Sequence, residues 1–233
     1  MYYTYYILGI ILLPGIILAT YAQTKVTTTF NKFSTTLALC GKTASEVARL
    51  FLDNAGLQNI QIIKSCGYLT DYYDHKKKVI ALSEDVYNSQ SISAIGVACH
   101  EVGHALQYKT KYPPIIIRNI IVHMCNFTSK GLWLLILVGA LLYYTPLGNI
   151  LMWIGVGIFG LSVLLNLVTL PVEYDASKKA TQLLEKSTIL TAEETRCTEK
   201  VLKAAALTYV ASLVISLLNL LRFVLSLIIR SRD

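Results

Sequence analysis

Charged residues are absent from three long stretches of this 233-residue chain. The first stretch is Tyr2–Ala22 and the second is Gly131–Val172. The third is Ala204–Leu221, after which only Arg222 interrupts an apolar run to Ile229. About 20 uncharged apolar residues are enough for a helix to cross a bilayer, and the second stretch is roughly twice that length. The pattern predicts a helical membrane protein.

The second stretch carries a turn signature near its middle, Tyr144–Asn149, which includes a proline and a glycine. We therefore expect a transmembrane hairpin with one helix over about 128–145 and the other over about 149–170. Residues 1–22 are expected to be a retained anchor rather than a signal peptide, because no basic segment precedes the apolar run. With a last helix over 204–229, the chain has about four transmembrane helices. A hairpin buried in the core of a soluble protein is the alternative, and the missing charges disfavour it.

The segment between the first two apolar stretches has the mixed pattern of a small α+β region. Thr43–Asn54 has apolar residues at helical spacing, and strands are expected at Ile60–Lys64, Tyr68–Tyr73 and Val79–Ser83. If Val79–Ser83 lies at a sheet edge, its free backbone groups offer a place for an extended peptide. A strand covered on both sides is the equally weighted alternative.

The residues with the most distinctive chemistry are His100-Glu101-Val102-Gly103-His104, an H-E-x-x-H pattern. Ser89, Ser91 and Ser93 precede this motif as candidates for a helix N-cap, and no proline follows until Pro113. The motif is therefore expected to lie within a helix that ends before Pro113.

On a helix, His100 and His104 are one turn apart on one face, so both imidazoles can bind a single Zn²⁺ ion. Glu101 lies beside the first ligand and can act as general base toward a water that the metal activates. A polar histidine pair near a surface is the alternative. Gly103 is a poor helix former, and it indicates that another backbone or the metal site comes close at this position.

A catalytic zinc ion needs a third protein ligand. The pattern H-E-x-x-H-x-x-G-x-x-H is excluded, because Gln107 and Thr110 stand at its two later positions. Among the later carboxylates Glu173 stands out, because it follows Pro171 at the expected start of a helix, on the side to which the hairpin returns. It is either a ligand or a helix N-terminal carboxylate favoured by the dipole. Asp175 could orient a ligating histidine.

The net charge of +7 follows the expected membrane topology and does not indicate nucleic-acid binding. Twelve Lys and Arg residues lie between Lys25 and Lys130, and six lie between Lys178 and Lys203. Positive residues accumulate on the cytoplasmic side, so both polar segments and the active site are expected there. Five scattered cysteines without a C-x-x-C pair indicate reduced thiols.

Two segments resemble the YugP-type family of bacterial membrane zinc metallopeptidases. These are Ala98–Gln107, which contains the motif, and Leu170–Ser177, which contains Glu173. The similarity covers essentially the whole chain and includes Ile80–Tyr87 ahead of the motif helix. The resemblance implies a gluzincin-like site, with Glu101 as the base and three metal ligands: His100, His104 and Glu173.

A more distant similarity is to membrane metalloproteases of the HtpX and CAAX-protease kind. Those enzymes carry E-x-x-x-D on the helix of the third ligand. This chain departs from that pattern, because Ser177 stands at the position of the Asp and the nearest Asp is Asp175. We therefore do not transfer the substrates of those enzymes to this chain, and the role of Asp175 stays open.

Together these observations predict an α+β fold, in which a helical membrane protein with about four transmembrane helices carries a small zincin-like cytoplasmic region built around the motif helix. The expected parts are a transmembrane anchor (1–22), the zincin-like region (23–127), a transmembrane hairpin (128–170), the third-ligand helix region (171–203) and a C-terminal transmembrane helix (204–229). The expected function is that of a multi-pass zinc endopeptidase of the cell membrane, with one Zn²⁺ per chain. Its substrates would be peptides or proteins, membrane proteins included. A non-catalytic membrane scaffold or chaperone-like protein with a structural zinc site is the alternative.

Overall fold

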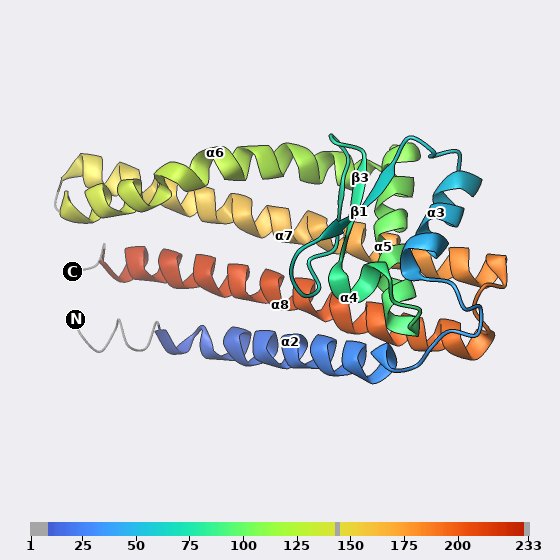
Figure 1. The fold of residues 1–233 in the computed structure, drawn as a ribbon. Coiled ribbons are helices and arrows are strands. Elements are labelled where there is room, and N and C mark those ends of the chain that lie inside the picture. The colour runs from blue at the N-terminus through green and yellow to red at the C-terminus, as the bar shows by residue number, and fades with distance from the viewer. Residues whose placement is uncertain (1–8, 143–144, 231–233) are drawn as a thin grey trace. The chain divides into compact units, whose positions relative to one another are not determined.

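The computed structural model describes residues 9–142 and 145–230, which form a mostly helical chain with one small sheet (Figure 1). The elements in chain order are α2 (Leu13–Ser34), α3 (Ala44–Asn54), β1 (Gln61–Ser65), β2 (Tyr72–Asp74), β3 (Val79–Ser83), α4 (Glu84–Tyr87), α5 (Ile92–Lys109), α6 (Pro113–Leu141), α7 (Pro146–Ser187) and α8 (Ala192–Arg230). The chain divides into two compact units. The helical unit comprises the chain up to Tyr21, Pro113–Leu170 and the chain from Thr208, and the mixed unit comprises Ala22–Tyr112 and Pro171–Leu207.

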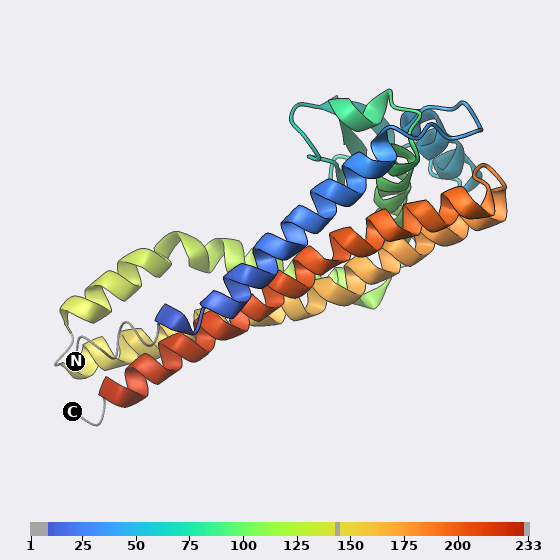
Figure 2. The same ribbon diagram turned by 90° about the horizontal axis from the view of Figure 1, so that it is seen from below.

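The helical unit is built from long segments that run lengthwise beside one another (Figures 1 and 2). The start of α2 packs closely on α8, because a Cβ built on Gly15 would lie 3.0 Å from the Ile215 side chain. The rings of Phe159 and Phe223, 5.2 Å apart, connect α7 to α8. These contacts bury little of the unit's apolar surface, and many of its large apolar side chains are exposed.

Two helices, α7 and α8, are long and apolar enough to cross a membrane. In the most apolar 18-residue stretch of each helix, only 11% of the residues of α7 and 6% of those of α8 are buried inside the protein. The core helix of a soluble protein would be mostly buried, so this exposure fits a membrane environment. Two of the four expected spans are therefore supported by length and composition.

The other two expected spans stay predictions. Neither α2 nor α6 meets the same test within the part of the chain that the structure describes, and residues 1–8 of the first expected span lie outside it. The helix expected over 128–145 begins much earlier, at Pro113, and two prolines suit its first turn. The first half of α6 contains Arg118, Asn119 and His123, which make α6 less uniformly apolar than a helix over 128–145 would be.

The expected boundary between residues 170 and 171 coincides with the division between the two compact units, but the helix start expected there was wrong. Pro171 lies inside α7, which continues without a break for 42 residues. Proline removes one N–H from the helical ladder, and α7 nevertheless continues through it. In the same way α8 runs through the boundary expected at residue 204.

The mixed unit contains a three-stranded sheet with the order β1-β3-β2. The central strand β3 pairs in parallel with β1 and antiparallel with β2. The hypothesis that Val79–Ser83 forms a sheet edge is therefore wrong, because both of its sides are paired. Strand β2 is shorter than expected and begins at Tyr72 rather than Tyr68.

Helix α5 lies in the core of the mixed unit, where it packs against α3, α4 and the sheet. Its N-cap is Ser91, whose side chain accepts a hydrogen bond from the backbone N–H of Ala94. Ser91 is one of the three serines that the sequence offers as N-cap candidates. The helix ends at Lys109, before Pro113. Because most of α5 is buried, the side chains of its motif are held within a rigid, packed element.

Candidate metal centre

Helix α5 carries His100, Glu101 and His104 within two turns. The two imidazole rings lie on one face of the helix with their centroids 4.7 Å apart and their planes nearly perpendicular. Glu101 is buried, with only 6% of its surface exposed. The spacing of the motif thus produces the pair of neighbouring imidazoles that the sequence predicts.

The close approach predicted at Gly103 occurs between α5 and α7. A Cβ built on Gly103 would lie 2.4 Å from the backbone oxygen of Ala176, which is far inside van der Waals contact. Only glycine therefore allows the two helix backbones to approach this closely. The approach brings Glu173, three residues before Ala176, over the face of α5 that carries the histidines.

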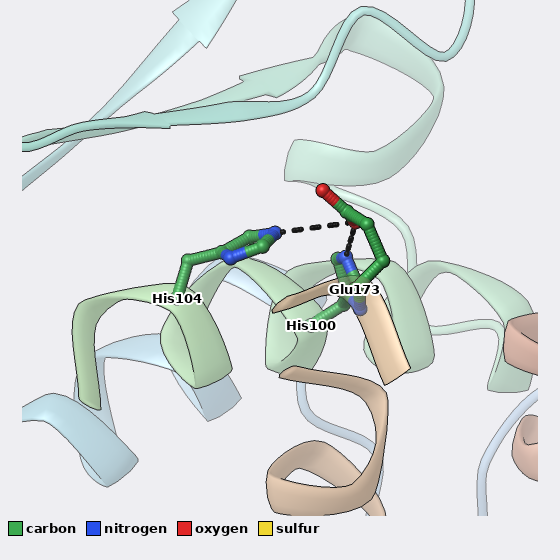
Figure 3. Close-up of side chains that lie close together, drawn as sticks. All are labelled: His100, His104 and Glu173. Atoms are coloured by element: carbon green, nitrogen blue, oxygen red, sulfur yellow. Dashed lines mark hydrogen bonds and ion pairs between the residues drawn. The ribbon is translucent and has the colours of Figure 1, made fainter. Parts of the chain in front are cut away.

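Glu173 joins the two histidines around one point (Figure 3). Its Oε2 atom lies 3.2 Å from Nε2 of His100 and 3.5 Å from Nε2 of His104. Glu173 is 4% exposed, and the ligand atoms of the three residues all lie within 4.8 Å of one another. The structure thus assembles a three-residue cluster from two helices that are far apart in the sequence.

The two separations between Glu173 and the histidines are those expected between ligands of a tetrahedral zinc ion. Two ligand atoms that each lie about 2.0–2.1 Å from one tetrahedral zinc are about 3.3 Å apart. The separations of 3.2 and 3.5 Å match this value. Two imidazoles and one carboxylate are also the donor set of a catalytic zinc site that keeps one position open for water.

Glu173 does not owe its position to a helix N-terminus. It lies deep inside α7, which begins at Pro146, so the helix-dipole alternative for this carboxylate is wrong. Asp175 does not reach the cluster. Its carboxylate accepts hydrogen bonds from Nε2 of Gln107, at 2.9 Å, and from Nζ of Lys179, at 2.6 Å. The structure therefore separates the two carboxylates, which the sequence places only two residues apart.

The electrostatics of the cluster reflect its burial. Burial raises the pKa of Glu101 above its ordinary range, although the neighbouring histidines act in the opposite direction. Burial would also raise the pKa of Glu173, but hydrogen bonds and charges from His100 and His104 outweigh it and lower this pKa. For His104, burial lowers the pKa, yet the bond to Glu173 and the nearby carboxylates raise it overall. In this buried cluster the carboxylates and the histidines thus stabilise the charged forms of one another, as is common in functional sites.

Two further side chains contact the histidines, and motif reasoning assigned a role to neither. The Ser177 hydroxyl lies 3.2 Å from Nδ1 of His100, and Oε1 of Gln107 lies 3.0 Å from Nδ1 of His104. Ser177 stands at the last position of the E-x-x-x-D pattern considered in the sequence analysis, so its place in that pattern could have pointed to this contact. Gln107 gave no such signal, because its role depends on the crossing of α5 and α7.

Comparison with known proteins agrees with this geometry. The model of a family described as "Putative neutral zinc metallopeptidase" matches residues 8–228. This chain belongs to that family. It is 43% identical over 217 residues to the "Putative membrane protease YugP" of Bacillus subtilis, and the match covers 93% of this chain and 94% of the relative. No solved structure matches the chain.

The raised pKa of His104 predicts how metal binding depends on pH. His104 must lose its proton to bind zinc, and its pKa in the metal-free protein lies above the ordinary value of about 6.5. As the solution is acidified, we therefore expect zinc affinity to begin falling at a pH above 6.5. Each zinc ion that binds should displace about one proton from His104. Competition with a chelator at a series of pH values measures this. An affinity that stays constant down to about pH 6 would contradict the prediction.

Proposed function

We propose that this chain is a membrane-embedded zinc endopeptidase that hydrolyses peptide bonds. The observation that carries the proposal is the convergence of His100, His104 and Glu173 beside the buried carboxylate of Glu101. A structural zinc site has no need of such an uncoordinated carboxylate, whereas hydrolysis needs a base. Membership of a zinc metallopeptidase family supports the same function.

The residues of the cluster divide the work of hydrolysis between them. His100, His104 and Glu173 would hold one Zn²⁺. The ion, when bound, supplies the positive charge that polarises a peptide carbonyl and lowers the pKa of water. Glu101 accepts the proton of the attacking water and passes it to the leaving amine as the C–N bond breaks. Burial suits Glu101 to this work, because its raised pKa lies closer to neutral pH than that of an exposed carboxylate.

The exposed edge of the sheet next to α5 is a place to hold the substrate. Strand β2 is an edge strand that packs on α5, and the ring of its Tyr73 lies 5.7 Å from the ring of Tyr108 on α5. An extended peptide could pair with the free side of β2. This role replaces the one considered for Val79–Ser83, whose backbone groups are already paired.

We place the enzyme in the cell membrane as a multi-pass protein with its active site on the cytoplasmic face. The apolar parts of α7 and α8 support the membrane location. The excess of Lys and Arg in the polar segments supports the cytoplasmic side. Peptides or proteins, membrane proteins included, are the proposed substrates.

The proposal is tested on the purified full chain in detergent or lipid vesicles. We expect about one zinc per chain, and hydrolysis of a dye-labelled unfolded protein that a chelator abolishes and added zinc restores. A chain without bound zinc after growth and purification with zinc, or a zinc-loaded chain without hydrolysis, would overturn the proposal.

Replacing Glu173 by alanine tests the third ligand. We expect zinc affinity to fall by more than about 100-fold, because even residues outside the ligand set cost 10–100-fold when changed. Glu185→Ala is the matched control, since Glu185 is an exposed carboxylate on the same helix. Equal zinc affinity of the two variants would show that Glu173 is not a ligand.

A further inference from the structure

Gln107 is a fully buried polar residue at the crossing of α5 and α7. All of its polar atoms have partners. Its Nε2 atom donates to the backbone oxygen of Val172, at 2.7 Å, and to Oδ2 of Asp175, at 2.9 Å. Its Oε1 atom lies 3.0 Å from Nδ1 of His104. One amide thus connects the second histidine of the motif to two groups on α7.

The partners of Gln107 leave its amide only one orientation. A backbone carbonyl can only accept a hydrogen bond, so the NH₂ group must face the carbonyl of Val172, and the Asp175 carboxylate lies beside it. Oε1 must then face His104, and it too can only accept. Nδ1 of His104 therefore carries a hydrogen and donates it to Gln107. Nε2 of His104 faces the Glu173 carboxylate at 3.5 Å, so a ring held by Gln107 through its Nδ1–H presents Nε2 to a metal ion at that point.

We propose that Gln107 and Asp175 form a positioning pair that holds His104 in the tautomer and ring orientation needed to bind the metal through Nε2. The inference rests on the proposed zinc site and adds the residues that prepare one of its ligands. It also gives Asp175 a role, because its carboxylate acts on His104 through Gln107 rather than by direct contact.

The two histidines are held in different ways. The partner of His100 Nδ1 is the Ser177 hydroxyl, which can donate as well as accept, so this contact does not by itself select a tautomer. The partner of His104 can only accept. We therefore expect the contact to Gln107 to matter more for metal affinity than the contact to Ser177.

The negative charge of Asp175 is itself held in place from α7. Both of its oxygens accept from Nζ of Lys179, at 2.8 and 2.6 Å, and Lys179 lies over the ring of Tyr112. The carboxylate fixed in this way accepts from Gln107, which keeps the amide from turning round. Through these hydrogen bonds, the amide of Gln107 fixes the His104 ring on α5 relative to Val172 and Asp175 on α7.

Zinc affinity, measured on the full chain with the metal alone, tests the positioning pair. We expect Gln107→Met, which keeps the volume but removes the amide, to bind zinc about 10–100-fold more weakly. Asp175→Asn keeps an acceptor for Gln107 and should lose less. Thr198→Val is the matched control, because Thr198 is also fully buried and donates to a backbone oxygen of α5, that of Ile92, without touching either imidazole.

Two measurements separate positioning from general loss of structure. Thermal unfolding of each metal-free variant shows whether it is folded, and the cobalt-substituted protein should show an altered visible spectrum in Gln107→Met but not in Thr198→Val. Nitrogen NMR of the unchanged chain, with labelled histidine, should show His104 protonated at Nδ1.

Some outcomes would overturn the inference. They are a His104 that carries no proton on Nδ1, or a zinc affinity of Gln107→Met no lower than that of Thr198→Val. A different result would refute the proposed function, namely an unchanged chain that binds no zinc or cleaves no peptide. Zinc binding and hydrolysis by the unchanged chain, with full affinity in Gln107→Met, would refute only the positioning pair.

Discussion

Replacing Glu101 by glutamine is expected to slow peptide hydrolysis by about 10²–10⁴-fold while zinc stays bound. The substitution keeps the size of the buried side chain but removes its ability to accept a proton. Zinc should remain, because the cluster of ligand atoms comprises His100, His104 and Glu173 and does not include Glu101. Hydrolysis of a labelled unfolded protein and the zinc content of the same sample measure both effects.

Glu185→Gln is the control for the Glu101 variant, because it makes the same chemical change at an exposed position on α7. It should leave both hydrolysis and zinc content unchanged. Unchanged hydrolysis in Glu101→Gln would refute the proposed mechanism. Absence of hydrolysis even from the unchanged zinc-loaded chain would favour the non-catalytic scaffold with structural zinc.

Replacing Gly103 by alanine is expected to separate the two halves of the metal centre. The added Cβ would lie 2.4 Å from the backbone oxygen of Ala176, so the α5 and α7 backbones must move apart. Overpacking of this kind costs about 1–3 kcal/mol of folding free energy. Because Glu173 is on α7 and the histidines are on α5, the same movement should weaken zinc binding by at least about 10-fold.

Two other glycines provide matched controls for this variant. A Cβ at Gly96, also on α5, would meet the side-chain methyl of Thr198 on α8 at 2.6 Å, and a side-chain atom can move more easily than a backbone. A Cβ at Gly157 would have no atom within 4 Å. Zinc affinity and thermal unfolding should be affected most at Gly103, less at Gly96 and least at Gly157. Zinc affinity of Gly103→Ala equal to that of Gly157→Ala would contradict the role of the helix crossing.

Around Gly103, the local sequence predicts the helix and its faces but not the neighbour of the glycine. Helical period alone places His100 and His104 on one face and marks Ser91 as a cap, because both depend only on residues within a few positions. A glycine in the middle of this helix indicated that something comes close. The sequence could not show that the neighbour is the backbone of Ala176, because that contact joins residues more than 70 positions apart.

The errors in the predicted elements have a common physical cause. Pro171 locally favours a helix start, but helical residues continue on both sides of it in α7. Val79–Ser83 has the composition of a strand, yet its place in the centre of the sheet depends on β1 and β2, which supply its partners. In each case the local preference was real, and contacts with distant segments decided the outcome.

The sequence by itself determined the apolar segments, the motif helix, the pair of histidines on one face and the glutamate beside them, since composition and short periodic spacing specify all of these. The sequence singled out Glu173, and the tertiary structure decided that this carboxylate, and not that of Asp175, reaches the histidines. It also decided that Gln107 and Ser177 contact the two rings. The reason is that a metal centre depends on separations of a few ångströms between helices, and the packing of α5 on α7 at Gly103 sets those separations.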